Sequence, residues 1–282
     1  MPDADTRHAT SEGLRSEGHV KNGTPTWPLV SVVTVVYNGE KYLQDTIKSV
    51  TNQDYSDFEY LIVDGGSTDS TLRIIQAYES KINYWISEPD KGISDALNKG
   101  ASLASGEYIL FLHADDQLFS SKALTQLVEA VKPSQKQWAM GFYKYLNSDS
   151  QIIKQDPLRS YCYRDMMLRN IIRHQATLIP QSAFDSLQFD TRFKYAMDYM
   201  FFLKLWNLLG PPEFLKNYIA YFRLDGNSLS SNYYASIADE MYARRIFRRE
   251  NGEHYMLPLD YCIYIFRLLK IFLYHSRKKL AR

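Results

Sequence analysis

The chain between residues 29 and 116 alternates between two patterns of hydrophobic and polar positions. Short apolar runs rich in β-branched residues predict strands buried on both faces, and apolar residues three or four positions apart predict amphipathic helices. The predicted strands are residues 29–38, 58–64, 82–88 and 107–116, and the predicted helices between them are residues 39–53, 67–80 and 92–105. This alternation predicts an α/β fold with a mainly parallel sheet and helices on both faces.

Carboxylates stand where two of these strands end. Asp64 closes the second strand before two glycines, and Asp115 and Asp116 close the fourth. Ligands of an open parallel sheet bind beyond the carboxyl ends of its strands, so we expect these side chains to lie near one site. The alternative is that Asp64 and Asp115 cap their loops, as aspartate often does.

Charge and motifs narrow the class of ligand. The net charge is +1, which gives no electrostatic reason to expect a nucleic-acid partner. Neither GxxxxGK[ST] nor GxGxxG occurs after the first strand, so a bound nucleotide diphosphate would need a divalent cation. The segment HADD, residues 113–116, offers oxygen ligands that suit Mg²⁺ or Mn²⁺.

The two ends of the chain differ from its centre. Residues 1–28 begin with a polar stretch that cannot bury enough surface to order itself, and it contains no signal-like apolar segment, so we expect a disordered arm. Cys162 and Cys262 lie far apart without metal-ligand spacing, which suits a reducing compartment. We therefore expect a cytoplasmic protein.

Three segments together resemble a known family. They are SVVTVVYNGEKYLQDTIKSVTNQDYSDFEYLIVDGGSTDST, KGISDALNKG and GEYILFLHADD. The chain from residue 29 to residue 226 resembles family 2 glycosyltransferases of the GT-A fold. More narrowly, it resembles bacterial enzymes that build the repeat units of O-antigen (lipopolysaccharide), capsule and exopolysaccharide. The resemblance implies transfer of a sugar from a nucleotide diphosphate sugar with inversion at the anomeric carbon.

The resemblance also implies roles for individual residues. The implied nucleotide-sugar site consists of Thr34, Val36, Tyr37, Asp64, Asp95, Asn98 and Asp115. Asp64 would bind the base, usually uracil in this family, which implies a UDP-linked donor. Asp116 would bind Mn²⁺ or Mg²⁺, with Asp115 towards the ribose. The chain departs from the family pattern at Gly65, where relatives carry a second acid, and at His113, where relatives carry Asn, Asp or another small polar residue.

The second half should supply the acceptor site and the general base. Asp198 stands among aromatic and apolar residues, where an unpaired carboxylate is costly, although it could also serve as a helix N-cap. The resemblance matches Asp198 to the family's catalytic base. His174 and Gln175 match a family HQ segment, and we expect both on the acceptor side. His113 joins them as a candidate, with a tolerated loop residue as the alternative.

Residues 227–282 predict a helical extension. After Asp260 the chain carries six basic residues and no acidic residue, and its longest uncharged run is six residues, too short to span a bilayer. This composition suits a helix on an anionic membrane surface, and the alternative is a helix packed on protein. We expect a peripheral protein at the inner face of the cytoplasmic membrane, with a glycan or polyprenyl-diphosphate-linked sugar as acceptor.

Three other functions fit parts of the pattern. A sugar nucleotidyltransferase would open with a Gly-rich basic loop, which VVYNGEKY lacks. A processive polysaccharide synthase would need membrane-spanning helices and a QxxRW motif, and this sequence has neither. A non-catalytic nucleotide-sugar-binding protein would keep the fold, but the presence of Asp64, Asp115, Asp116 and Asp198 favours an enzyme.

Overall fold

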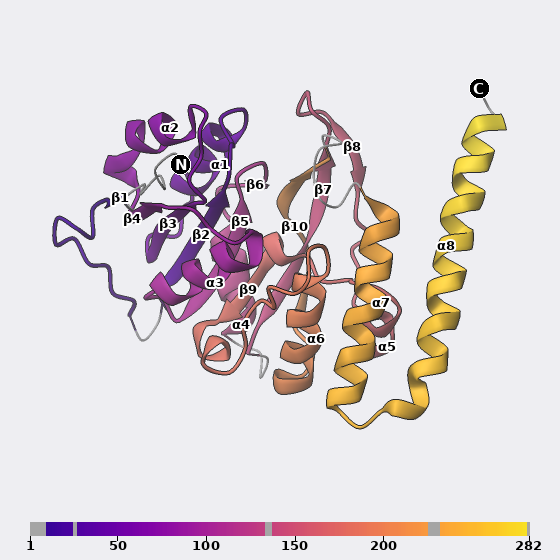
Figure 1. Cartoon of the computed structure of the whole chain (residues 1–282). Coiled ribbons are helices and arrows are strands. Elements are labelled where there is room, and N and C mark those ends of the chain that lie inside the picture. Colours follow the sequence, from indigo (N-terminus) through magenta and orange to yellow (C-terminus); the bar gives the residue numbers. More distant parts are fainter. Residues whose placement is uncertain (1–9, 25–26, 133–136, 225–231, 281–282) are drawn as a thin grey trace, which may run out of the picture.

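A ten-stranded sheet organises the computed structural model, which describes residues 10–24, 27–132, 137–224 and 232–280, with side chains as far as residue 273. The strands are β1 Thr10–Glu12, β2 Val30–Val36, β3 Phe58–Asp64, β4 Tyr84–Ser87, β5 Tyr108–His113, β6 Gln117–Leu118, β7 Ala139–Leu146, β8 Ile152–Gln155, β9 Thr177–Pro180 and β10 Glu213–Arg223. The helices are α1 Leu43–Thr51, α2 Thr71–Ala77, α3 Ile93–Leu103, α4 Ala123–Val131, α5 Tyr163–Leu168, α6 Met197–Leu209, α7 Tyr233–Glu250 and α8 Leu257–Leu280. Figure 1 shows the sheet between these helices, with α7 and α8 beyond its β7–β10 end.

The strand order is β1-β4-β3-β2-β5-β9-β7-β10-β6, with β8 paired to β7. The four strands predicted from the sequence pair in parallel, with β2 between β3 and β5 and with β4 beside β3. β9 runs antiparallel between β5 and β7, and β7 pairs in parallel with β10. The predicted α/β fold with a mainly parallel sheet is confirmed.

Alternate residues of each central strand enter two different hydrophobic cores. Val33 and Val35 of β2 pack in the core that includes α3, α5, α6 and part of α7. Val32 and Val36 pack in the core that includes α1, α2 and α4. Because both faces are covered, the strand is apolar at nearly every position, which explains the uninterrupted run in the sequence.

The predicted helix over residues 67–80 begins later, at Thr71. The backbone N–H and the hydroxyl of Ser67 both donate to Asp64, and the N–H of Thr68 donates to the Asn38 side chain at 2.8 Å. These bonds hold residues 67 and 68 in a non-helical conformation, because short polar side chains compete with helical bonding.

The N-terminal arm is more ordered than the sequence predicts. The expectation of disorder over residues 1–28 is wrong for its described part, because β1 pairs antiparallel with β4 and extends the sheet. Arg15 pairs with the buried carboxylate of Glu59 and donates to the Leu103 carbonyl at 2.8 Å. Apolar burial alone predicts disorder here, but the Arg15–Glu59 ion pair also holds the arm against the sheet. Residues 1–9 and 25–26 of the predicted arm lie outside the described residues.

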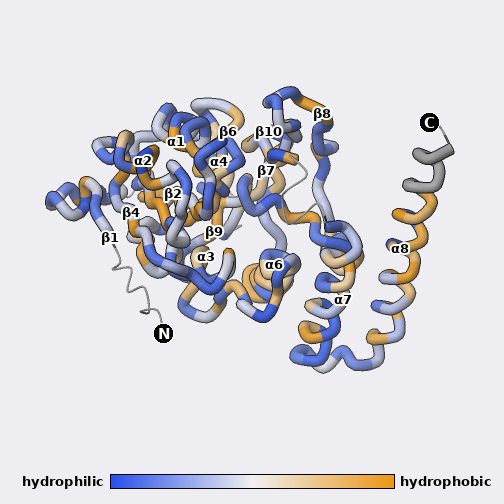
Figure 2. The backbone as a smooth tube through the Cα atoms, turned by 45° about the horizontal axis from the view of Figure 1, so that its top comes forward, coloured by the Kyte–Doolittle hydropathy of each residue, from blue (hydrophilic) through white to orange (hydrophobic). Residues whose placement is uncertain are grey.

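The C-terminal helices form a hairpin in which α8 packs against α7 (Figure 1). The predicted domain boundary between residues 226 and 227 lies outside the described residues. Apolar residues recur along α8, as the hydropathy colours of Figure 2 show, and five of the large ones form an exposed outer face. The members of this outer face, each 46–62% exposed, are Tyr261, Ile265, Leu269, Phe272 and Leu273. Among the described helices, none has both the length and the apolar character that a membrane span requires.

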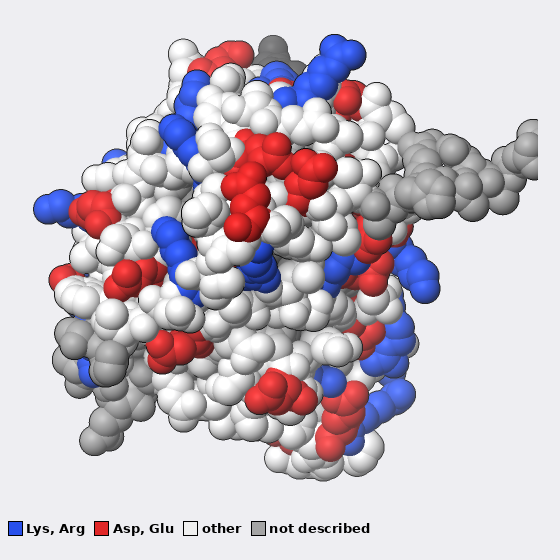
Figure 3. All heavy atoms as spheres, turned by 90° about the vertical axis from the view of Figure 1, so that its left-hand side faces the viewer, with Lys and Arg blue, Asp and Glu red and all other residues white. Residues whose placement is uncertain are grey.

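The surface on the side of β1 and α2 carries both signs of charge. Figure 3 looks onto this side, and its Lys and Arg side chains lie scattered among Asp and Glu side chains. The described residues of this face therefore form no continuous basic patch of the kind that binds a phosphate backbone.

Candidate active site

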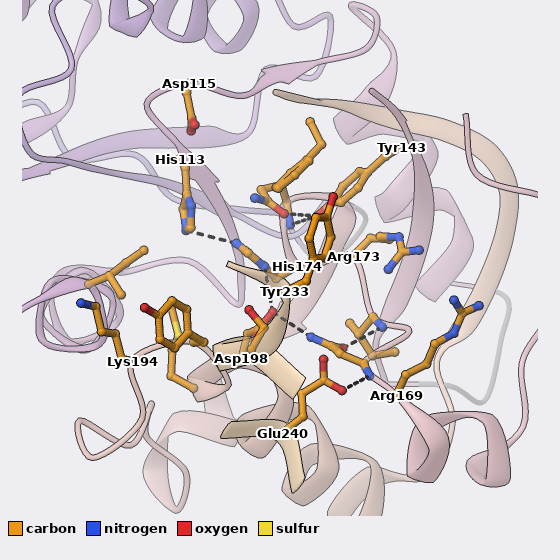
Figure 4. Close-up of a pocket in the computed structure, with 18 of the residues that line it drawn as sticks. His113, Asp115, Tyr143, Arg169, Arg173, His174, Lys194, Asp198, Tyr233 and Glu240 are labelled. Carbon is orange, nitrogen blue, oxygen red and sulfur yellow. Dashed lines mark hydrogen bonds and ion pairs between the residues drawn. The ribbon is translucent and has the colours of Figure 1, made fainter. Parts of the chain in front are cut away.

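A cavity of about 1560 Å³ opens at the carboxyl ends of β2 and β5. Tyr37 follows β2 and lines one side, and His113 and Asp115 at the end of β5 line another. Asp198 of α6 lines the opposite side, and the cavity continues past α7 to α8. Figure 4 shows His113 and His174 between the carboxylates of Asp115 and Asp198. The fold thus brings together residues that are more than eighty positions apart.

Asp198 is positioned by the start of α6. Asp239 of α7 accepts hydrogen bonds from the N–H groups of Tyr195 and Ala196, at 2.8 and 3.0 Å, and thereby fixes the first turn of this helix. Oδ1 of Asp198 accepts from the N–H of Tyr199 at 2.7 Å, and Oδ2 accepts from Nδ2 of Asn170 at 2.8 Å. The side chain is 19% exposed, so the carboxylate is fixed in direction yet reachable from the cavity.

Two histidines connect the two sides of the cavity. Nε2 of His113 lies 3.1 Å from Nε2 of His174, and Nδ1 of His174 lies 3.5 Å from Oδ2 of Asp198. His174 reaches this position because its short helix, His174–Ala176, leads into β9, the neighbour of β5. Burial and the adjacent His174 lower the pKa of His113 well below its usual range, so this ring is neutral at pH 7.

Asp116 lies behind the cavity instead of on its surface. The residue is 1% exposed, and its Oδ2 accepts from Nε2 of Gln175 at 2.6 Å while Oδ1 accepts from the N–H of Arg223 at 2.9 Å. Burial and the neighbouring Asp115 raise the pKa of Asp116 well above its usual range, against the opposing effect of Arg223 and Gln175. Tyr143 donates to Gln175 and completes this network.

Seven of the predicted residues line the cavity, namely Val36, Tyr37, His113, Asp115, His174, Gln175 and Asp198. Five do not line it, namely Thr34, Asp64, Asp95, Asn98 and Asp116.

Like Asp116, the other four residues that do not line the cavity make hydrogen bonds within the protein. The Thr34 hydroxyl shares a hydrogen bond with Tyr60 in the core, and Asp95 accepts from the N–H of Lys91 at 3.0 Å. Asn98 exchanges two hydrogen bonds of 2.8 Å with the backbone of Phe189. Asp64 is fully buried and accepts from Ser67 and Ser87, which agrees with the loop-capping alternative.

Sequence reasoning missed several polar residues of the cavity. Asp90 lines it and follows the third predicted strand, so the same strand-end signal that identified Asp64 could have found it. Gly65 makes room for Asp90, because a Cβ at this glycine would lie 2.4 Å from Oδ2 of Asp90. Other missed lining residues, which stand in segments without a motif, are Arg169, Asn170, Lys194 and Glu240.

A divalent cation fits the donor groups beside β5. His113, Asp115 and Asp116 each offer one ligand atom, and these three atoms lie within 4.8 Å of one another. Asp115 and His113 line the cavity, whereas Asp116 is turned into the network with Gln175 and Arg223. The predicted ligand Asp116 therefore belongs to this group of donors, while Asp115 and His113 are the members that line the cavity.

Comparison with known proteins shows to which family this chain is similar. The model described as glycosyl transferase family 2 matches residues 31–185. TuaG of Bacillus subtilis, named for teichuronic acid biosynthesis, is 31% identical over 79% of this chain and 89% of its own. An uncharacterized glycosyltransferase of Mycobacterium tuberculosis is 32% identical over 63% of this chain and 68% of its own.

Two solved structures share the fold. Staphylococcus aureus TarS in complex with UDP-GlcNAc has a TM-score of 0.61 at 20% identity, and the match covers 76% of this chain and 66% of that chain. The mannosyltransferase PcManGT of Pyrobaculum calidifontis, in complex with GDP-Man and Mn²⁺, has a TM-score of 0.60 at 16% identity, with 93% and 83% covered.

Proposed function

Because the chain belongs to glycosyl transferase family 2, we propose that it is an inverting, metal-dependent glycosyltransferase of bacterial surface polysaccharide synthesis. The donor is a nucleotide diphosphate sugar, UDP-linked as in the TarS complex, and the acceptor is a hydroxyl of a glycan or lipid-linked sugar. The observation that carries this proposal is that Asp115 and Asp198 line one cavity from opposite sides, with the two histidines between them.

The proposed chemistry is a single displacement. Asp198 accepts the proton of the acceptor hydroxyl, which attacks C1 of the donor sugar on the face opposite the nucleotide. Asn170 and the N–H of Tyr199 keep the carboxylate aimed at that hydroxyl. Tyr37 and Asp90 line the end of the cavity assigned to the nucleotide. Asp115 and His113 would hold a divalent cation, which would supply positive charge to stabilise the departing diphosphate.

The far end of the cavity supports a lipid-linked acceptor. Ile263, Phe266 and Ile271 of α8 contribute apolar lining there, and Arg267 and Lys270 contribute basic groups. An apolar surface beside cations suits a polyprenyl chain and its diphosphate. The outer face of α8 and the six basic residues after Asp260 suit an anionic membrane, which would place the protein peripherally at the cytoplasmic leaflet.

The donor assignment is tested by incubating purified protein with a panel of UDP-, GDP- and dTDP-sugars in Mn²⁺, Mg²⁺ or EDTA. We expect one nucleotide to be released with metal, and Asp115→Ala to lower that release at least about tenfold. Asp185→Asn, at an exposed site outside the cavity, is the matched control. Metal-dependent donor binding without release, even with acceptor glycans and lipid-linked sugars present, would instead identify a non-catalytic nucleotide-sugar-binding protein.

The membrane assignment is tested by flotation with vesicles of phosphatidylcholine alone or with phosphatidylglycerol. We expect the protein to float with the anionic vesicles, and Leu269→Glu/Phe272→Glu to reduce the bound fraction at least about tenfold, because two apolar side chains no longer enter the interface. Leu208→Glu is the control, since Leu208 is a 53% exposed apolar residue of α6 and not of α8. Equal flotation of the α8 double variant and the wild type would contradict the assignment.

A further inference from the structure

The group of side chains that could hold a cation includes an imidazole. His113 is the last residue of β5, and its ligand atom lies within 4.8 Å of those of Asp115 and Asp116. Asp116 already accepts hydrogen bonds on both carboxylate oxygens and does not line the cavity. The donors that reach the cavity are therefore one nitrogen group and one carboxylate, and not two carboxylates.

The surroundings of His113 resemble those of a metal-bound histidine. A histidine ligand uses one ring nitrogen for the metal and turns the other towards a hydrogen-bond partner that fixes the ring. Nε2 of His113 faces Nε2 of His174 at 3.1 Å, and His174 in turn faces the Asp198 carboxylate through Nδ1. In the tautomer in which Nε2 of His113 is the donor, it donates to Nε2 of His174, and Nδ1 of His174 donates to Asp198. Nδ1 of His113 then carries the lone pair that a metal ion needs.

We propose that His113, through the ring nitrogen turned away from His174, binds the cation together with Asp115, and that this pair selects a transition cation such as Mn²⁺ over Mg²⁺. Mg²⁺ takes oxygen ligands in near-ideal octahedral geometry, whereas first-row transition cations also accept imidazole. The inference rests on the metal dependence in the proposed function, and it adds the ligand and the reason for the choice of metal.

Electron spin echo envelope modulation of bound Mn²⁺ tests the ligand directly. Untagged protein is measured with Mn²⁺ alone and with Mn²⁺ plus UDP. We expect ¹⁴N modulation in at least one condition, and its replacement by ¹⁵N modulation in ¹⁵N-labelled protein. His113→Ala should remove the signal, and His254→Ala, at an exposed histidine, should keep it. A wild-type spectrum without protein nitrogen in both conditions would overturn the proposal, as would an unchanged signal in His113→Ala.

Competition measures the selectivity. Mg²⁺ is added to displace the bound Mn²⁺, and the amount displaced is measured from the signal of free Mn²⁺. We expect the wild type to need about tenfold more Mg²⁺ for half displacement than His113→Asp, in which an oxygen ligand replaces the nitrogen. Equal Mg²⁺ requirements would overturn the selectivity. Both readouts are independent of sugar transfer, so a nitrogen signal without donor release contradicts only the proposed function, and release without a nitrogen signal contradicts only this inference.

Discussion

We expect Asp198→Asn to lower the rate of sugar transfer by about 10²–10⁴-fold and to leave donor affinity within about twofold of the wild-type value. The amide has nearly the shape of the carboxylate but cannot accept the acceptor proton. Its oxygen can still accept from the N–H of Tyr199, so α6 keeps its first turn. The donor side should be unaffected because Asp115 lies across the cavity from this residue, as Figure 4 shows. The measurement is kcat with the donor identified by the panel, beside donor affinity from calorimetry.

The control for this prediction is again Asp185→Asn, which removes a carboxylate from an exposed position outside the cavity. Retention of more than about a tenth of the wild-type rate in Asp198→Asn would contradict the assignment of the base. Glu240 would then become the carboxylate to test, since it also lines the cavity and its side chain is 13% exposed.

The sequence predicts the central sheet well because its strands are buried on both faces. Such strands carry their signal locally, as the run at Val30–Val36 does, and the predicted strand at residues 58–64 has the observed bounds. Helix starts were less predictable. Residues 67 and 68 have the composition of a helix N-terminus. Ser67 instead bonds to the nearby Asp64, and Thr68 bonds to Asn38 of another loop, and periodicity encodes neither contact.

The site was predictable in its residue types and less so in its geometry. Asp115 and Asp116 are adjacent in sequence, and no local pattern says which of them reaches the cavity. That choice depends on Gln175 and Arg223, which engage Asp116 from η2, the short helix at residues 174–176, and from β10. Likewise, the approach of His174 to His113 requires β9 to insert antiparallel between β5 and β7. Contacts of this kind arise from topology and could not be read from spacing.

The C-terminal helix α8 also makes contacts that could not be read from the sequence. Asp260 stands out in the sequence only as the acid that precedes a basic segment, yet it is fully buried between two arginines of α7. Nε of Arg244 lies 2.7 Å from its Oδ1, and Nε of Arg248 lies 3.0 Å from its Oδ2. The alternative of packing on protein therefore describes the inner face of α8, and the membrane proposal concerns its outer face.

Asp260→Ala should lower the free energy of unfolding by about 3–5 kcal/mol, because it leaves the buried charges of Arg244 and Arg248 without their shared partner. Urea unfolding measures the global part of this loss, and hydrogen exchange of α8 measures any local release of the helix. Asp190→Ala is the control, since its partner Arg192 is 59% exposed and such a surface pair contributes only about 0–1 kcal/mol. Equal stability of the two variants, with unchanged exchange in α8, would contradict a structural role for the buried ion pairs.

The Asp260→Ala substitution should also affect Asp198, the proposed base. Arg244 donates to the Tyr199 hydroxyl at 3.2 Å and to the Met167 carbonyl at 2.8 Å, and the N–H of Tyr199 donates to Asp198. An Arg244 that has lost Asp260 keeps its bonds to Tyr199 and Met167 but loses the carboxylate that orients its guanidinium, so the support it gives to the start of α6 weakens. We therefore expect Asp260→Ala to lower kcat more than it lowers donor affinity, even at temperatures where the variant remains folded. A variant with a detached α8 and an unchanged kcat would show instead that the tail helix and the base act independently.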